Sequence, residues 1–222
     1  MKLKTTLLAG LLTAANAAII SQYTFDNPTG SATNPASSIV AGGTSSSDFG
    51  VGAGFTGTAQ TVEYAFVSQS LGLELGVGSD LADAISTNEY FTFSMTINEG
   101  VTADLTNLTL DVARSTNGAQ DFYVFSSITG FTTADVLDSA TGVATTGSSI
   151  DVDLSGSEFQ GLTNETVEFR VYVDNRYFNA NGGSGTYVDN VTLNGTVAVP
   201  EPSSLALLGL GALTITARRK RS

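Results

Sequence analysis

The segment Tyr90–Ile97 reads YFTFSMTI and decides the class of fold. Large apolar side chains alternate along it with polar ones, and in a β-strand the two sets point to opposite faces. The apolar set is Phe91, Phe93, Met95 and Ile97. One apolar face and one Thr-rich polar face are typical of an antiparallel sheet that covers a core on one side.

The same alternation returns along the chain and predicts about nine strands. The others are expected at residues 19–25, 62–66, 71–75, 108–112, 122–128, 150–154, 169–173 and 187–197. Residues 27–58 are rich in Gly, Ser and Thr, and we expect a long connecting loop with one strand there. A short helical turn is expected at residues 80–85, with Ser79 or Asp80 as its N-cap. Without crossover helices, residues 18–198 are predicted to be all-β, a two-sheet antiparallel sandwich of jelly-roll type.

Composition excludes several classes of function. The 222 residues contain no Cys and no His, which removes thiolate and imidazole metal sites and His-dependent catalytic triads. The net charge is −12, and residues 18–199 hold only three basic side chains, Arg114, Arg170 and Arg176, against 20 acidic ones. Such a body repels phosphate backbones, so nucleic-acid binding is excluded.

The first 17 residues read as a secretory signal peptide. Lys2 and Lys4 precede a short apolar stretch at residues 7–14, and Ala15 and Ala17 provide small residues at the −3 and −1 positions. Signal peptidase is therefore expected to cut after Ala17. The apolar stretch is far shorter than the roughly 20 residues that a membrane-spanning helix needs.

The C-terminal end, residues 199–222, has three parts. Pro200, Glu201 and Pro202 come first, an uncharged run at residues 203–217 follows, and a basic cluster closes the chain. As a helix the run would span about 22 Å, short for a hydrocarbon core of about 30 Å. Its large apolar side chains are Leu205, Leu207, Leu208, Leu210, Leu213 and Ile215, and the basic cluster is Arg218, Arg219, Lys220 and Arg221. The cluster would hold the tail end in the cytoplasm.

These three parts, over residues 199–221, resemble the PEP-CTERM sorting signal of Gram-negative bacterial surface proteins. The resemblance implies a single short membrane helix, transient anchoring in the inner membrane, and an exosortase-type transpeptidase that cuts near Pro200-Glu201-Pro202. It also implies delivery to the cell surface or the extracellular matrix. A plain single-span anchor stays open as an alternative, whereas a GPI signal normally ends apolar and does not fit the basic cluster.

The body resembles the β-sandwich ectodomains that commonly precede this tag, in residues 114–131, 153–172 and 187–197. Such domains look like carbohydrate-binding jelly rolls. The resemblance implies a structural or adhesive role, with a module that binds extracellular polysaccharide as the alternative.

Two places are candidates for ligand binding, and we expect no catalytic residue and no organic cofactor. Asp189 shares the parity of Val191 and Leu193, which points it to the core side; it is expected either to accept backbone amides or to bind a structural Ca²⁺. Arg176, Tyr177 and Phe178 form an exposed Arg-aromatic group that would stack on a sugar ring or dock a partner. The competing interpretation is that this group closes the end of the sandwich.

Overall fold

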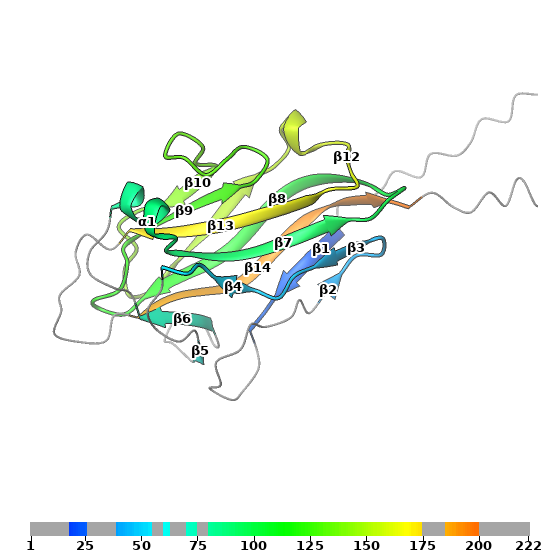
Figure 1. Cartoon of the computed structure of the whole chain (residues 1–222). Helices are drawn as coiled ribbons and strands as arrows, with labels where there is room; N and C mark the ends of the chain where they lie inside the picture. The colour runs from blue at the N-terminus through cyan, green and yellow to red at the C-terminus, as the bar shows by residue number, and fades with distance from the viewer. Residues whose placement is uncertain are drawn as a thin grey trace, which may run out of the picture.

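Two antiparallel sheets face each other in the computed structural model, which describes residues 18–25, 39–54, 60–62, 70–74, 80–174 and 185–199 (Figure 1). Sheet A has the strand order β11-β8-β14-β1-β2; in addition β12 pairs with β8, β6 with β14, and β5 with β6. Its strands are β1 (Ala18–Tyr23), β2 (Ile39–Val40), β5 (Gln60–Val62), β6 (Ser70–Glu74), β8 (Thr102–Arg114), β11 (Ser148–Asp153), β12 (Leu162–Thr163) and β14 (Gly185–Ala198).

Sheet B has the order β10-β9-β13-β7-β3, and β4 also pairs with β7. Its strands are β3 (Thr44–Ser46), β4 (Gly50–Val51), β7 (Tyr90–Ile97), β9 (Asp121–Ser126), β10 (Asp138–Ala140) and β13 (Thr166–Asp174). Helical structure in the described residues is confined to α1 (Leu81–Thr87) and the 3₁₀ turn η1 (Ser157–Phe159). The all-β, two-sheet sandwich that the sequence predicts is confirmed.

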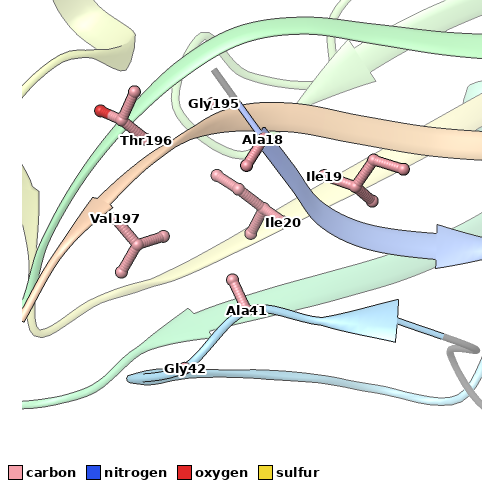
Figure 2. A pocket seen from close by; sticks show the side chains of 8 residues that line it. All are labelled: Ala18, Ile19, Ile20, Ala41, Gly42, Gly195, Thr196 and Val197. Carbon is pink, nitrogen blue, oxygen red and sulfur yellow. The ribbon is translucent and has the colours of Figure 1, made fainter. Parts of the chain in front are cut away.

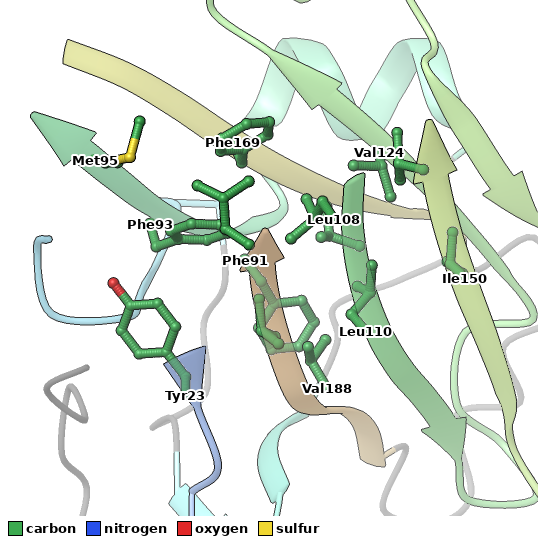
Figure 3. Packing of buried hydrophobic residues seen from close by; sticks show 14 of the residues in the cluster. Tyr23, Phe91, Phe93, Met95, Leu108, Leu110, Val124, Ile150, Phe169 and Val188 are labelled. Atoms are coloured by element: carbon green, nitrogen blue, oxygen red, sulfur yellow. The ribbon is translucent and has the colours of Figure 1, made fainter. Parts of the chain in front are cut away.

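The segment that reads YFTFSMTI forms β7, and its burial alternates at every residue as the pattern predicts. Its apolar side chains meet those of sheet A across the core (Figure 3). The ring of Phe93 lies 5.3 Å from that of Tyr23 and 5.3 Å from that of Phe169, measured between centroids. The buried hydroxyl of Tyr23 donates a hydrogen bond of 2.6 Å to the carbonyl oxygen of Ser47, so this polar atom is satisfied inside the apolar layer.

The structure differs from the sequence prediction mainly in short strands. Within residues 27–58, where one strand was expected, β2, β3 and β4 are each two or three residues long. A strand of that length has no alternation to recognise. Of the strand expected at 62–66, only Val62 is described, as the last residue of β5 (Gln60–Val62), and residues 63–66 lie outside the described residues.

The helical turn expected at residues 80–85 is α1. Asp80 is its N-cap, because the Asp80 carboxylate accepts a hydrogen bond from the backbone N–H of Asp83 at 3.0 Å. The helix ends at Asn88, which has a left-handed backbone with φ of 62°. Ser79, the other expected cap, lies outside the described residues.

Candidate functional sites

The first candidate site is the end of β14, where the sandwich meets the C-terminal segment. β14 lies in the middle of sheet A, between β8 and β1, and pairs with β8 from Thr186 to Ala198 (Figure 1). Pairing with β1 begins at Gly195, opposite Ala18, and continues upstream. Beyond Gly195, residues 196–198 of β14 therefore pair only with β8 in the described part of the chain.

A break in register marks the same position. Asn194 pairs with Asn107 and Gly195 pairs with Leu105, so β8 carries one extra residue at Thr106. Gly195 is required there, because a Cβ at this position would overlap the carbonyl oxygen of Asp104. A pocket of about 200 Å³ lies beside it, between the start of β1, the β2–β3 turn and the end of β14 (Figure 2).

The second candidate site is the outer face of sheet A, where polar side chains of neighbouring strands hydrogen-bond to one another. The Asn107 amide donates to Asp151 at 2.8 Å. The Ser149 hydroxyl donates to Asp111 at 2.5 Å, and the Gln22 amide donates to the Thr192 hydroxyl at 3.2 Å. This face therefore offers carboxylate, amide and hydroxyl groups from β11, β8, β14 and β1.

Asp189 belongs to this outer face, which corrects the parity argument made from the sequence. The register opposes Asp189 to Asp111 and Val188 to Val112, and directly opposed residues of an antiparallel pair share a face. Val188 faces the core. A bulge follows at Asn190, whose φ is 49°, and it shifts the parity of Val191 and Leu193 relative to Asp189.

Asp189 is nevertheless a buried residue, only 1% exposed. Its Oδ1 accepts the backbone N–H of Asn190 at 2.8 Å. The Asn190 side-chain amide bridges two carboxylates, donating to Asp111 at 3.0 Å and to Asp189 at 3.4 Å. The described residues contain no group of three acidic side chains placed to hold a metal ion. Calcium binding at Asp189 stays a prediction.

The third candidate is Arg170 on the outer face of sheet B, which the sequence analysis did not single out. Its guanidinium carbon lies 4.3 Å from the ring centroid of Tyr90 and 4.0 Å from that of Phe131. Glu168 accepts two hydrogen bonds from it, at 2.7 and 3.1 Å, and the Tyr172 hydroxyl is 3.1 Å away. Glu168 and Arg170 are two residues apart on one strand, so their side chains lie on the same face, and this spacing could have indicated the ion pair from the sequence.

Partial burial by itself lowers the pKa of Arg170, but the hydrogen bonds to Glu168 and Tyr172 and their charges outweigh it, so the pKa is raised. The guanidinium is therefore a fixed positive charge clamped between two rings. Its side chain is only 20% exposed, and each of its three guanidinium nitrogens donates to Glu168 or Tyr172, which fits a structural role better than a free ligand-binding arginine.

The remaining sequence candidates lie outside the described residues. These are the signal-peptide residues, Arg176, Tyr177 and Phe178, and the whole chain from Pro200 onward. None of the helices in the described ranges is long and apolar enough to span a membrane.

The C-terminal segment of the chain matches a known family model. The model of the PEP-CTERM protein-sorting motif matches residues 198–221. The chain carries a PEP-CTERM sorting motif. The motif makes this an exported protein that passes through a membrane, and its first residue, Ala198, is also the last residue of β14. None of the curated proteins matches the chain.

Solved structures that resemble this chain include adhesin and carbohydrate-binding domains. The K1 adhesin domain of Lys-gingipain from Porphyromonas gingivalis is 14% identical, with a TM-score of 0.35 over 80% of this chain and 97% of that one. A family 29 carbohydrate-binding module from Piromyces equi is 11% identical, with a TM-score of 0.38 over 82% and 91%. A family 28 module specific for non-crystalline cellulose is 10% identical, with a TM-score of 0.43 over 65% and 86%. These low scores carry no argument about what this chain binds.

Proposed function

We propose that this chain is a non-catalytic protein of the cell surface or extracellular matrix with a structural or adhesive role. The single observation that carries the proposal is the sorting motif at residues 198–221, which begins where the last strand of the sandwich ends. An exosortase-type transpeptidase would cut near Pro200, Glu201 and Pro202. The broken peptide bond would pass its acyl group to water or to an amine acceptor, and the tail would leave with a new amino terminus.

The position of the motif supports removal of the tail without loss of the fold. Every residue of the described apolar core precedes Ala198, and Val199 is 54% exposed. A cut beyond Val199 therefore takes away no buried apolar surface from the described sandwich. Before the cut, the apolar run at residues 205–217 and the basic residues 218–221 would hold the chain in the inner membrane.

The test replaces Pro200, Glu201 and Pro202 by alanine in the native host. The uncut, membrane-held form should accumulate, whereas the matched variant Ser203→Ala with Ser204→Ala should be processed like the wild type. Mass spectrometry of the mature protein is expected to find Ala18 at the amino terminus and a carboxyl terminus near residues 200–202. A mature protein that keeps residues 203–222 would refute processing at this motif and favour a plain anchor.

A carbohydrate-binding module is the second candidate, and the outer face of sheet A supports it. This face presents donors and acceptors together, for example the Asn107 amide beside the Asp151 carboxylate, which suits a hydroxyl-rich polymer. A pull-down with the host's own polysaccharide tests the hypothesis that the chain binds carbohydrate. Asn107→Ala with Thr109→Ala probes the sheet, and Arg176→Ala with Tyr177→Ala and Phe178→Ala probes the Arg-aromatic group. The absence of saturable binding by the wild type would rule the module out.

A further inference from the structure

We propose that residues 196–198 must detach from β8 before the chain is processed, so that opening of this strand end sets the rate of cutting. The inference rests on the proposed processing at the sorting motif. It adds a step that the motif alone does not contain: the substrate of the processing enzyme is a locally opened form of the sandwich.

The overlap between motif and fold carries the argument. Ala198, the first residue of the matched motif, is paired with Thr102 of β8, and Pro200 follows only two positions later in the sequence. Proteolytic enzymes act on locally opened chain, and a chain segment held in a sheet is protected from them. An enzyme that takes several residues on each side of a cut near Pro200 therefore needs residues that the sandwich holds in β14.

The structure makes this strand end easier to open than the strand behind it. Among the described residues, 196–198 pair with β8 alone, whereas Thr192 and Leu193 pair with both β1 and β8, and Leu193 is buried. The register break at Thr106 and the glycine at position 195 separate the two stretches. Opening can therefore proceed to Gly195 and stop there, because further opening would expose the core.

Besides the β8 pairing, Val197 and Val199 make small apolar contacts that hold the strand end. Val197 packs half-buried at the edge of the core, next to the pocket of about 200 Å³ (Figure 2). A methyl group of Val199 lies against Gly43, where an added Cβ would stand 2.9 Å from it. Ala198 and most of Val199 are exposed. When these residues leave the sheet, little buried apolar surface becomes exposed to water. Opening of the strand end therefore costs little free energy.

The test is a disulfide that locks the strand end. The chain has no cysteine, so Thr102→Cys with Ala198→Cys creates a single possible bridge. Opposed residues of an antiparallel pair have Cα atoms about 4.5–5.5 Å apart, within the range that a disulfide spans. The matched control, Thr109→Cys with Thr192→Cys, joins the same two strands on the other side of Gly195. The bridged fraction is measured by thiol alkylation of the full chain in its own cells.

Pulse-chase processing of the chain bridged at 102–198 should slow by about tenfold or more and recover on reduction, while the 109–192 bridge leaves the rate within about twofold of wild type. Equal rates for the bridged and wild-type chains would overturn the inference. A second variant inserts Gly-Ser-Gly-Ser between Val199 and Pro200 and leaves the sandwich untouched. It should be processed faster than wild type and should be insensitive to the 102–198 bridge; failure of either result would also overturn the inference.

These outcomes separate the two proposals. If the wild-type chain is never shortened, or if alanines at positions 200–202 make no difference, the proposed function fails. If the wild type is shortened in a motif-dependent way and the 102–198 bridge has no effect, only the opening step fails.

Discussion

On sheet A most of the described side chains that point away from the core are polar, and several hydrogen-bond to one another, whereas on sheet B a second apolar layer covers part of the outer face. Ala84 of α1 packs there with Phe125 and Tyr172, and Phe131 from the segment after β9 joins them. The strands of both sheets alternate in the same way. The two faces differ because α1 and residues 127–137 pack on the outer face of sheet B. The alternation within a strand therefore predicts which side chains face the core, whereas the connecting segments determine whether the outer face is covered.

The largest difference in stability between the two faces is expected when one side chain on each face is truncated to alanine. Phe125 is fully buried, with its ring centroid 5.2 Å from that of Tyr172. Phe125→Ala should reduce the free energy of unfolding by about 3–5 kcal/mol in urea denaturation, because it leaves a cavity under α1. Thr109→Ala, on the open face of sheet A, should change it by less than about 0.5 kcal/mol. Equal effects would mean that the layer over sheet B adds nothing to stability.

Arg170 tests whether the second layer depends on its charge or only on its apolar contacts. Arg170→Met keeps bulk but loses the carboxylate pair and both cation–π contacts, and should cost about 1–2 kcal/mol. Arg170→Lys keeps the charge but not the planar fork that binds Glu168 twice, so it should recover less than half of that loss. A lysine variant as stable as the wild type in urea denaturation would show that a point charge is enough.

On sheet A the corresponding test is the bulge at Asn190. Its φ of 49° is costly for residues with a Cβ other than Asn or Asp. Asn190→Ala and Asn190→Gly both remove the amide between Asp111 and Asp189, so the difference between them isolates backbone strain. The alanine variant should be less stable than the glycine variant by about 1 kcal/mol. Equal melting curves would mean that the bulge relaxes at no cost.

This bulge also shows where sequence reasoning reached its limit. The alternation of β7 predicted its burial residue by residue, because a strand with one buried face repeats every two residues. The parity of Val191 and Leu193 could not be carried back to Asp189, since one extra residue at Asn190 reverses every face behind it. An Asn in a strand pattern is a weak signal for such an insertion, and nothing else in the sequence locates it.

The candidate sites divide in the same way. The sorting motif was readable because its parts are local in sequence, and the family model matches residues 198–221. The clamp on Arg170 was not, because Tyr90 and Phe131 come from segments far apart in the chain. The packing of α1 on one face of the sheet is a tertiary contact, and the periodicity of the strands does not predict it.

The two faces should also respond to opposite ends of the pH range. Burial raises the pKa of Tyr90 on sheet B above its ordinary 10.0, and the positive charge of Arg170 opposes this shift. The neutral Tyr90 hydroxyl therefore contributes to the free energy of unfolding below pH 10, and this contribution is lost as the pH rises further. Hydrogen bonds from Ser155 lower the pKa of Asp153 on sheet A below its ordinary 3.8, so its contribution is present above that pH and is lost as pH falls. Denaturation curves should lose part of the alkaline slope in Tyr90→Phe and part of the acid slope in Asp153→Asn. The reverse pairing of variant and slope would contradict the assignment.

The smallest effect is expected from metal removal, and it probes the carboxylates of sheet A directly. Asp189 has the Asn190 backbone N–H as a donor at 2.8 Å, and it shares the Asn190 side-chain amide with Asp111. Hydrogen bonds of this kind stabilise a carboxylate without a cation, so EDTA should leave the melting temperature unchanged within error. A fall of several degrees that Ca²⁺ restores would contradict this and make Asp189 a calcium ligand. In that event Asp189→Asn should abolish the response to EDTA, because the amide that replaces the carboxylate lacks the charge that holds the ion.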